Sequence, residues 1–285
     1  MRLLLLSIFL VMSLQAKSFF SNSQQADSSV YIGALKDLII ATQKTRGLTN
    51  SYLNGNPTAM LLVYGNRDDM KTAIGTMESL PLAADTVINT RATAISQALI
   101  KLNNKAFKMK ASDVFSGYTE QIGQTLMLAQ TVNKRFSKDL SPFGQQVSTI
   151  MMEIMLPMTE YVGQMRGFGA GLAAKGSVEQ SQYEKIIVLA NQIQKLNKKL
   201  QSEMMLVASQ HKDKYASNIQ SEISAVDNAV RAYITFAQNN FKDTASVKNV
   251  DPDDYFEQGT KLISLIIKAY NANNKALLED SKGWF

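Results

Sequence analysis

The sequence predicts an all-α protein made of two packed up-down helical bundles with about eight long helices. Apolar residues recur with the 3.6-residue period along most of the chain, and no segment alternates convincingly with period two. The 285 residues include only 5 prolines, most of which lie at joints between periodic segments. Short joints between long helices favour antiparallel neighbours, which is the arrangement found in bundles.

The boundaries of the predicted helices follow from proline and capping residues. Proline is expected in the first turn of the following helix at four joints, namely Pro57, Pro81, Pro142 and Pro252. After Gly176, Ser177 as N-cap and Gln180 form a predicted capping box. The expected helices are 27–54, 57–80, 82–106, 111–137, 142–175, 178–210, 213–241 and 252–280.

Residues 1–16 have the pattern of a secretory signal peptide. Arg2 is the charged start, the run from Leu3 to Leu14 is apolar, and Ala16 is a suitable last residue before cleavage. The apolar run is too short for a confident membrane span, and an uncleaved N-terminal anchor is the alternative. We therefore expect a periplasmic protein whose mature part, residues 17–285, forms one all-helical sensor domain of two bundles. It contains no cysteine, so its stability comes from packing alone.

The composition argues against several classes of function. The formal net charge of +6 is a mild excess without a dense basic block, which disfavours nucleic-acid binding. With His211 as the one histidine and no cysteine, zinc, haem and iron–sulfur sites are implausible. Nucleotide-binding and nucleophile-elbow motifs are also missing, so we expect neither a cofactor nor an enzyme. The methionines at 151, 155, 158 and 165 form a stripe that is typical of core filler.

A short internal repeat supports two bundles that each contain an Arg-Gly step. Arg46-Gly47 and Arg166-Gly167 lie about 120 residues apart, each near the end of a long predicted helix. Several glycines crowd the second helix end, at positions 163, 167, 169 and 171. Glycine disfavours helix, so this crowding indicates a close backbone approach, either to a neighbouring helix or to a ligand.

Arg46 lies near the centre of an apolar stripe on the first predicted helix. The stripe consists of Tyr31, Leu35, Leu38, Ile39, Thr42, Thr49 and Leu53. A guanidinium in that position needs a partner, because an isolated buried charge costs several kcal/mol at least. No acid lies nearby on the same helix. Two interpretations remain: an ion pair with an acid on another helix, such as Glu153 or Glu160, or a bound small anion.

Arginine is the side chain best suited to hold a flat oxyanion. Its planar guanidinium presents paired N–H donors that match nitrate, nitrite or a carboxylate edge to edge. Arg46 and Arg166 are the principal candidates, and Arg231, in an apolar sequence context, is a third. Arg67 has adjacent acids that indicate a surface pair. The remaining predicted ligand-binding residues are Thr45, Thr49, Gly47 and Gly167.

At these positions the chain resembles the nitrate- and nitrite-sensing (NIT) domain family. The resemblance rests on residues 43–48 with 52–55, on residues 165–172, and on the aromatic-to-Thr segment 254–260. It implies two helical bundles whose inner helices hold the anion through arginines, a role that it assigns to Arg46 and Arg166 and extends to Arg231. The chain departs from many members at Thr45, where they have a charged residue before the first Arg-Gly.

The expected function is therefore non-catalytic sensing of nitrate or nitrite through buried arginines. Family domains usually feed an output module, and none follows here, so a separate membrane receptor or histidine kinase is the expected partner. A second copy of the chain in a homodimer is a further candidate partner. Two alternatives remain: a periplasmic structural or interaction protein without a small ligand, and a sensor of another small anion such as a carboxylate.

Overall fold

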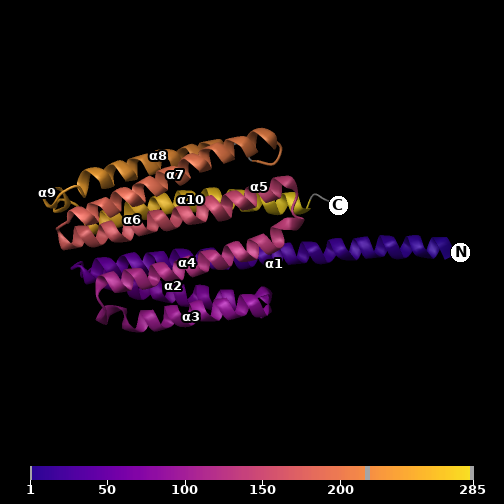
Figure 1. Ribbon diagram of the computed structural model, residues 1–285, viewed down its shortest axis with the longest axis horizontal. Helices are drawn as coiled ribbons and strands as arrows, with labels where there is room; N and C mark the ends of the chain where they lie inside the picture. The colour runs from indigo at the N-terminus through magenta and orange to yellow at the C-terminus, as the bar shows by residue number, and fades with distance from the viewer. Residues whose placement is uncertain (1, 216–218, 283–285) are drawn as a thin grey trace.

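The protein is all-α, as the sequence predicts. The computed structural model describes residues 2–215 and 219–282, with side chains from 25 to 215 and from 219 to 281, and every regular element in these residues is a helix. Figure 1 shows long helices that run roughly side by side. The predicted signal peptide, residues 1–16, lies in the part of the chain whose side chains are not described.

The first bundle contains the four N-terminal helices. They are α1 (Arg2–Leu53), α2 (Ala59–Ser79), α3 (Thr86–Lys105) and α4 (Ala111–Phe136). Short 3₁₀ turns, Pro81–Ala84 and Ala106–Lys108, join α2 to α3 and α3 to α4. Asp85 caps α3, because its carboxylate accepts hydrogen bonds from the backbone N–H groups of Val87 (3.1 Å) and Ile88 (3.2 Å).

The second bundle contains the remaining helices and is reached through a 3₁₀ turn, Ser137–Asp139. Its helices are α5 (Pro142–Ile150), α6 (Leu156–Lys175), α7 (Gln180–Gln210), α8 (Ile219–Asn240), α9 (Thr244–Val247) and α10 (Pro252–Lys282). Asp251 caps α10 by accepting 2.9 Å hydrogen bonds from the N–H groups of Asp253 and Asp254. Most predicted helix boundaries agree with the structure to within two residues, but α1 begins at Arg2 and not at 27, α3 at Thr86 and not at 82, and α8 at Ile219 and not at 213. Pro57 and Pro81 precede α2 and α3 and do not lie in their first turns.

The predicted helix 142–175 is interrupted by one π-helical turn, Met151–Met155. Pro157 explains the interruption, because it has no N–H to donate to the carbonyl of Glu153 four residues earlier. The predicted capping box is wrong in its position: α7 is capped by Glu179 with Gln182, whose side-chain oxygen accepts from the Glu179 N–H at 2.9 Å. The cap is shifted because α7 begins two residues later than predicted.

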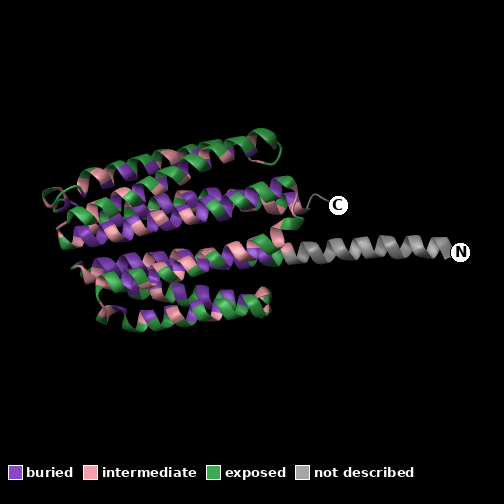
Figure 2. Ribbon diagram, in the orientation of Figure 1, coloured by how far each residue is buried: buried purple, intermediate pink, exposed green. Residues whose placement is uncertain are grey.

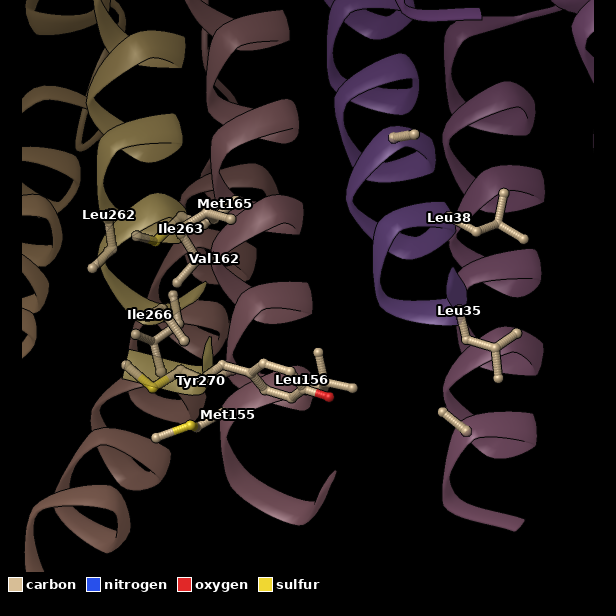
Figure 3. Packing of buried hydrophobic residues seen from close by; sticks show 14 of the residues in the cluster. Leu35, Leu38, Met155, Leu156, Val162, Met165, Leu262, Ile263, Ile266 and Tyr270 are labelled. Carbon is tan, nitrogen blue, oxygen red and sulfur yellow. The ribbon is translucent and has the colours of Figure 1, made fainter. Parts of the chain in front are cut away.

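The core lies along the inner helices of both bundles. Figure 2 shows buried residues concentrated on α1, α4, α6 and α10 and exposed residues on the outer helices α3 and α8. In the second bundle, Val162 and Met165 of α6 lie near Ile263 and Ile266 of α10, whereas Leu35 and Leu38 belong to the first bundle (Figure 3). Met151, Met155, Met158 and Met165 are all buried, which confirms that the methionine stripe is core.

The two bundles meet where α1 contacts α6. Each of these helices also packs against the other helices of its own bundle, α1 against α2 and α4, and α6 against α7 and α10. The contact between α1 and α6 therefore joins an inner helix of one bundle to an inner helix of the other. Among the residues that the structure describes, no helix has both the length and the apolar character needed to cross a bilayer.

Candidate anion site between the two bundles

Two glycines allow α1 and α6 to approach closely. A Cβ atom added to Gly167 would lie 2.8 Å from the Cα of Gly47, and one added to Gly47 would lie 2.6 Å from the Phe256 ring. Neither distance is sterically allowed, so only glycine fits at this crossing. Arg46 and Arg166 directly precede these glycines, so both lie next to the crossing in sequence, although their side chains make different contacts. The crowding of glycines in α6 thus reflects helix contact.

We expect Gly167→Ala to weaken this crossing. The added methyl meets backbone atoms of α1, which cannot rotate away, and the free energy of unfolding should fall by about 1–3 kcal/mol in urea titrations. Gly65→Ala on α2 is the matched control, since nothing lies within 4 Å of its Cβ position. That variant should gain up to about 1 kcal/mol from helix propensity. Equal effects of the two substitutions would contradict a tight crossing.

Arg46 is completely buried and paired with an acid of the other bundle. Its side chain is 0% exposed, and its Nη1 and Nη2 atoms lie 2.5 Å and 3.2 Å from the two carboxylate oxygens of Glu160. Nη1 also donates to the Thr119 hydroxyl at 2.9 Å, and the guanidinium lies 4.9 Å from the Phe115 ring centre. The ion-pair interpretation of Arg46 is therefore correct, with Glu160 and not Glu153 as the acid.

Arg166 is buried without such an acid. It is 2% exposed, its Nη1 donates to the Thr260 hydroxyl at 2.9 Å, and its guanidinium lies 4.4 Å from the Phe256 ring centre. Its Nε and Nη2 atoms have no hydrogen-bond partner in the described part of the chain, and no carboxylate there lies within 4 Å. Burial lowers the pKa of Arg166 to about 10, so the group stays charged at neutral pH.

The surroundings of the two arginines carry an excess of positive charge. The charge of Arg46 contributes to lowering the pKa of Arg166 and, after burial, that of Lys185 on α7. Tyr233 favours the charged form of Arg166 most, followed by two carboxylates, namely the paired Glu160 and the exposed Glu257. Of these two carboxylates, only Glu160 is buried. The cluster formed by Arg46, Arg166 and Lys185 is therefore suited to an additional negative charge.

The comparisons with known proteins identify the family and the fold. The sequence profile of the nitrate and nitrite sensing family, NIT, matches residues 37–277. The chain belongs to the NIT family. No curated protein sequence matches the chain. A solved structure of the NasR transcription antiterminator is similar over 98% of this chain and 75% of that chain, with a TM-score of 0.68 and 14% sequence identity. At this identity the similarity shows a shared fold.

In this NIT domain the predicted threonines do not contact the arginines. Thr45 is buried, donates to the carbonyl of Ala41 at 3.0 Å and accepts from the Asn66 side chain at 2.6 Å. Thr49 is buried as well. The threonines that do contact the arginines are Thr119 and Thr260. Thr260 ends one of the segments that resembles the family, whereas no sequence signal marks Thr119.

Arg231 is not brought to the cluster formed by Arg46, Arg166 and Lys185. Its side chain is 75% exposed, and its Nε lies 2.9 Å from the carboxylate of Asp227 one helical turn earlier. It lies on the outward side of α8, whose inward side carries Val230 and Tyr233. The expectation of a third buried arginine at this position is therefore wrong. The predicted surface pair of Arg67 with its adjacent acids is also not observed. The guanidinium of Arg67 packs against an aromatic ring instead, 4.4 Å from the centre of Phe107.

Proposed function

We propose that this NIT protein is a non-catalytic sensor of nitrate or nitrite and that the anion binds to Arg166 between the two bundles. The observation that carries the proposal is the unpaired Nε and Nη2 of a buried guanidinium. The N–H bonds of these two atoms are nearly parallel along one edge of the guanidinium plane, and two oxygens of a planar anion can accept them together. A bound anion would also offset the desolvation of Arg166.

Neighbouring groups would complete the site. The Tyr233 hydroxyl is buried near Arg166 and makes no hydrogen bond of normal geometry. It interacts with the Tyr255 hydroxyl, and we expect it to donate to the anion instead. Gly259 lets α10 pack closely against Tyr233 and Arg166, since a Cβ there would lie 2.6 Å from the Tyr233 hydroxyl and 2.8 Å from the Cβ of Arg166. The paired Arg46 would add positive charge without giving up its contact with Glu160.

The expected signal is a change in how α1 contacts α6. The charges of Arg46 and Arg166 repel each other across this contact, and an anion between them would reduce that repulsion. Because each helix is the inner helix of one bundle, a change in the angle at which the two helices cross would reorient the bundles as rigid units. We further propose that the protein is exported to the periplasm and passes this change to a separate membrane receptor or histidine kinase.

Thermal unfolding tests the ligand directly. A ligand that binds only the folded protein stabilises it by about 2.7 kcal/mol at one hundred times its Kd, which corresponds to a rise of several degrees in Tm. We expect sodium nitrate or nitrite to raise the Tm in a saturable manner, and sodium chloride at equal ionic strength to have a much smaller effect. Identical curves for nitrate, nitrite and chloride would contradict the proposal.

A small carboxylate is the second candidate ligand. The pair formed by Arg46 and Glu160 shows that a carboxylate fits a guanidinium at this interface. Formate, acetate and small dicarboxylates should therefore be titrated in competition with nitrate. If nitrate is the natural ligand, these compounds will displace it only at concentrations well above its own Kd. If a carboxylate binds more tightly than nitrate, the proposed ligand becomes a small carboxylate and is no longer nitrate or nitrite.

A further inference from the structure

Lys185 lies at the outer side of the arginine cluster and contacts two aromatic rings. It is an exposed residue of α7, and its ammonium lies 4.4 Å from the ring centre of Phe168 and 5.3 Å from that of Phe115. The two rings come from different bundles, Phe115 from α4 and Phe168 from α6, and meet edge to face at 6.2 Å. Arg46 lies 4.9 Å from the centre of the same Phe115 ring.

Lys185 is not needed for an ion pair. Among the residues that the structure describes, no carboxylate lies within 4 Å of its ammonium, and the neighbouring Glu184 accepts a hydrogen bond from Gln180 instead. Its charge is nevertheless close enough to Arg46 for the two to repel each other. A role in attracting an anion would account for a further positive charge at this position, beside its contacts with the two rings.

The aromatic pair lies directly against the close helix crossing. A Cβ on Gly167 would lie 3.3 Å from the Phe115 ring, so this ring borders the site where α1 and α6 meet. Phe115 is buried, whereas Phe168 and Lys185 are at least partly exposed to solvent. From the surface inward, the groups are therefore Lys185, then the two rings, then Arg46 with Glu160.

We propose that Lys185 and the pair Phe115–Phe168 form the path by which the anion reaches the buried arginines. This inference rests on the proposed function. Lys185 concentrates the anion at the surface, and a small displacement of the two rings admits it to the interface. The rings otherwise keep water away from the arginines, where a lower local dielectric strengthens the attraction between guanidinium and anion.

This role predicts an effect on the rate of association. Removing a charge at the mouth of a path reduces electrostatic steering, and the reduction disappears when salt screens the field. We expect Lys185→Gln to lower the association rate constant by roughly two- to five-fold at low ionic strength and to change the dissociation rate constant much less. Lys185→Arg, which keeps the charge, should behave like the wild type.

The measurement is a titration of the full chain with sodium nitrate, followed through the methyl signal of Met165. This residue is buried directly before Arg166, and line shapes of its signal yield both rate constants. Ionic strength is set with a bulky organic sulfonate, which is too large for the site. Lys199→Gln is the matched control, because it removes the same charge from an exposed position of the same helix.

The outcomes separate this inference from the proposed function. The path is supported if the association rate constant of Lys185→Gln at low salt is lower than that of Lys199→Gln. This difference should disappear at high salt, and Lys185→Arg should have the rate constant of the wild type. Equal association rate constants for the two glutamine variants, in a protein that binds nitrate, overturn the path alone. A change confined to the dissociation rate constant also overturns it. A wild-type protein without any response to nitrate overturns both the path and the proposed function.

Discussion

Replacing Arg166 with methionine should abolish the response to nitrate without destabilising the protein. Arg166 is a buried charge with no carboxylate within 4 Å, and its removal eliminates the cost of desolvating that charge. We expect the Tm of Arg166→Met without nitrate to equal or exceed that of the wild type. We expect the rise in Tm with nitrate to disappear.

Arg231→Met is the control for this experiment. It removes an arginine that is 75% exposed and holds only a surface ion pair, which contributes about 1 kcal/mol or less. Its Tm and its nitrate response should both match the wild type. A structural role for Arg166 would give the opposite pattern, namely a large loss of stability in Arg166→Met together with an unchanged nitrate response.

Glu160→Gln should destabilise the protein and strengthen its response to anions. The substitution leaves Arg46 buried without its counter-charge, and breaking such a pair costs about 3 kcal/mol even though the amide oxygen still accepts one hydrogen bond. The loss is to be measured by urea unfolding in a buffer with a bulky anion. Nitrate should then raise the Tm by more than in the wild type, because two guanidinium groups now lack a negative partner.

Glu153→Gln provides the comparison for Glu160→Gln. Glu153 was the other acid considered for Arg46, and it lies exposed on the π-helical turn of the same bundle. Its substitution should change the free energy of unfolding by less than about 0.5 kcal/mol. If Glu160→Gln were as stable as Glu153→Gln and showed the same nitrate response as the wild type, the buried cluster would not control anion binding.

The sequence was sufficient for the helices and for the two principal arginines. The period-3.6 pattern defines most helix boundaries because this signal is local, whereas only Pro142 and Pro252 of the four joint prolines begin an α-helix. Arg46 could be assigned to a core stripe because its helical neighbours at spacings of three, four and seven are apolar. The sequence left Glu153 and Glu160 as candidate ion-pair partners of Arg46. It could not decide between them, since the decision depends on how α1 and α6 cross.

The other site residues depend on tertiary contacts that a single sequence does not contain. Arg231 has apolar neighbours in sequence, but the 100° step between helical residues turns it away from the inward-facing Val230 and Tyr233. Thr119 reaches Arg46 only because α4 packs against α1. Lys185 reaches Phe115 only because of the way α7 packs. No periodicity argument distinguishes them from ordinary surface residues.

A crystal structure of the protein grown with nitrate tests the central claim most directly. The claim is that the free edge of Arg166 is built for a flat anion. We predict a nitrate ion in the plane of this guanidinium, with two oxygens about 2.7–2.9 Å from Nε and Nη2. Density for nitrate elsewhere, with the same edge of Arg166 turned to a water molecule or a protein carbonyl, would contradict it.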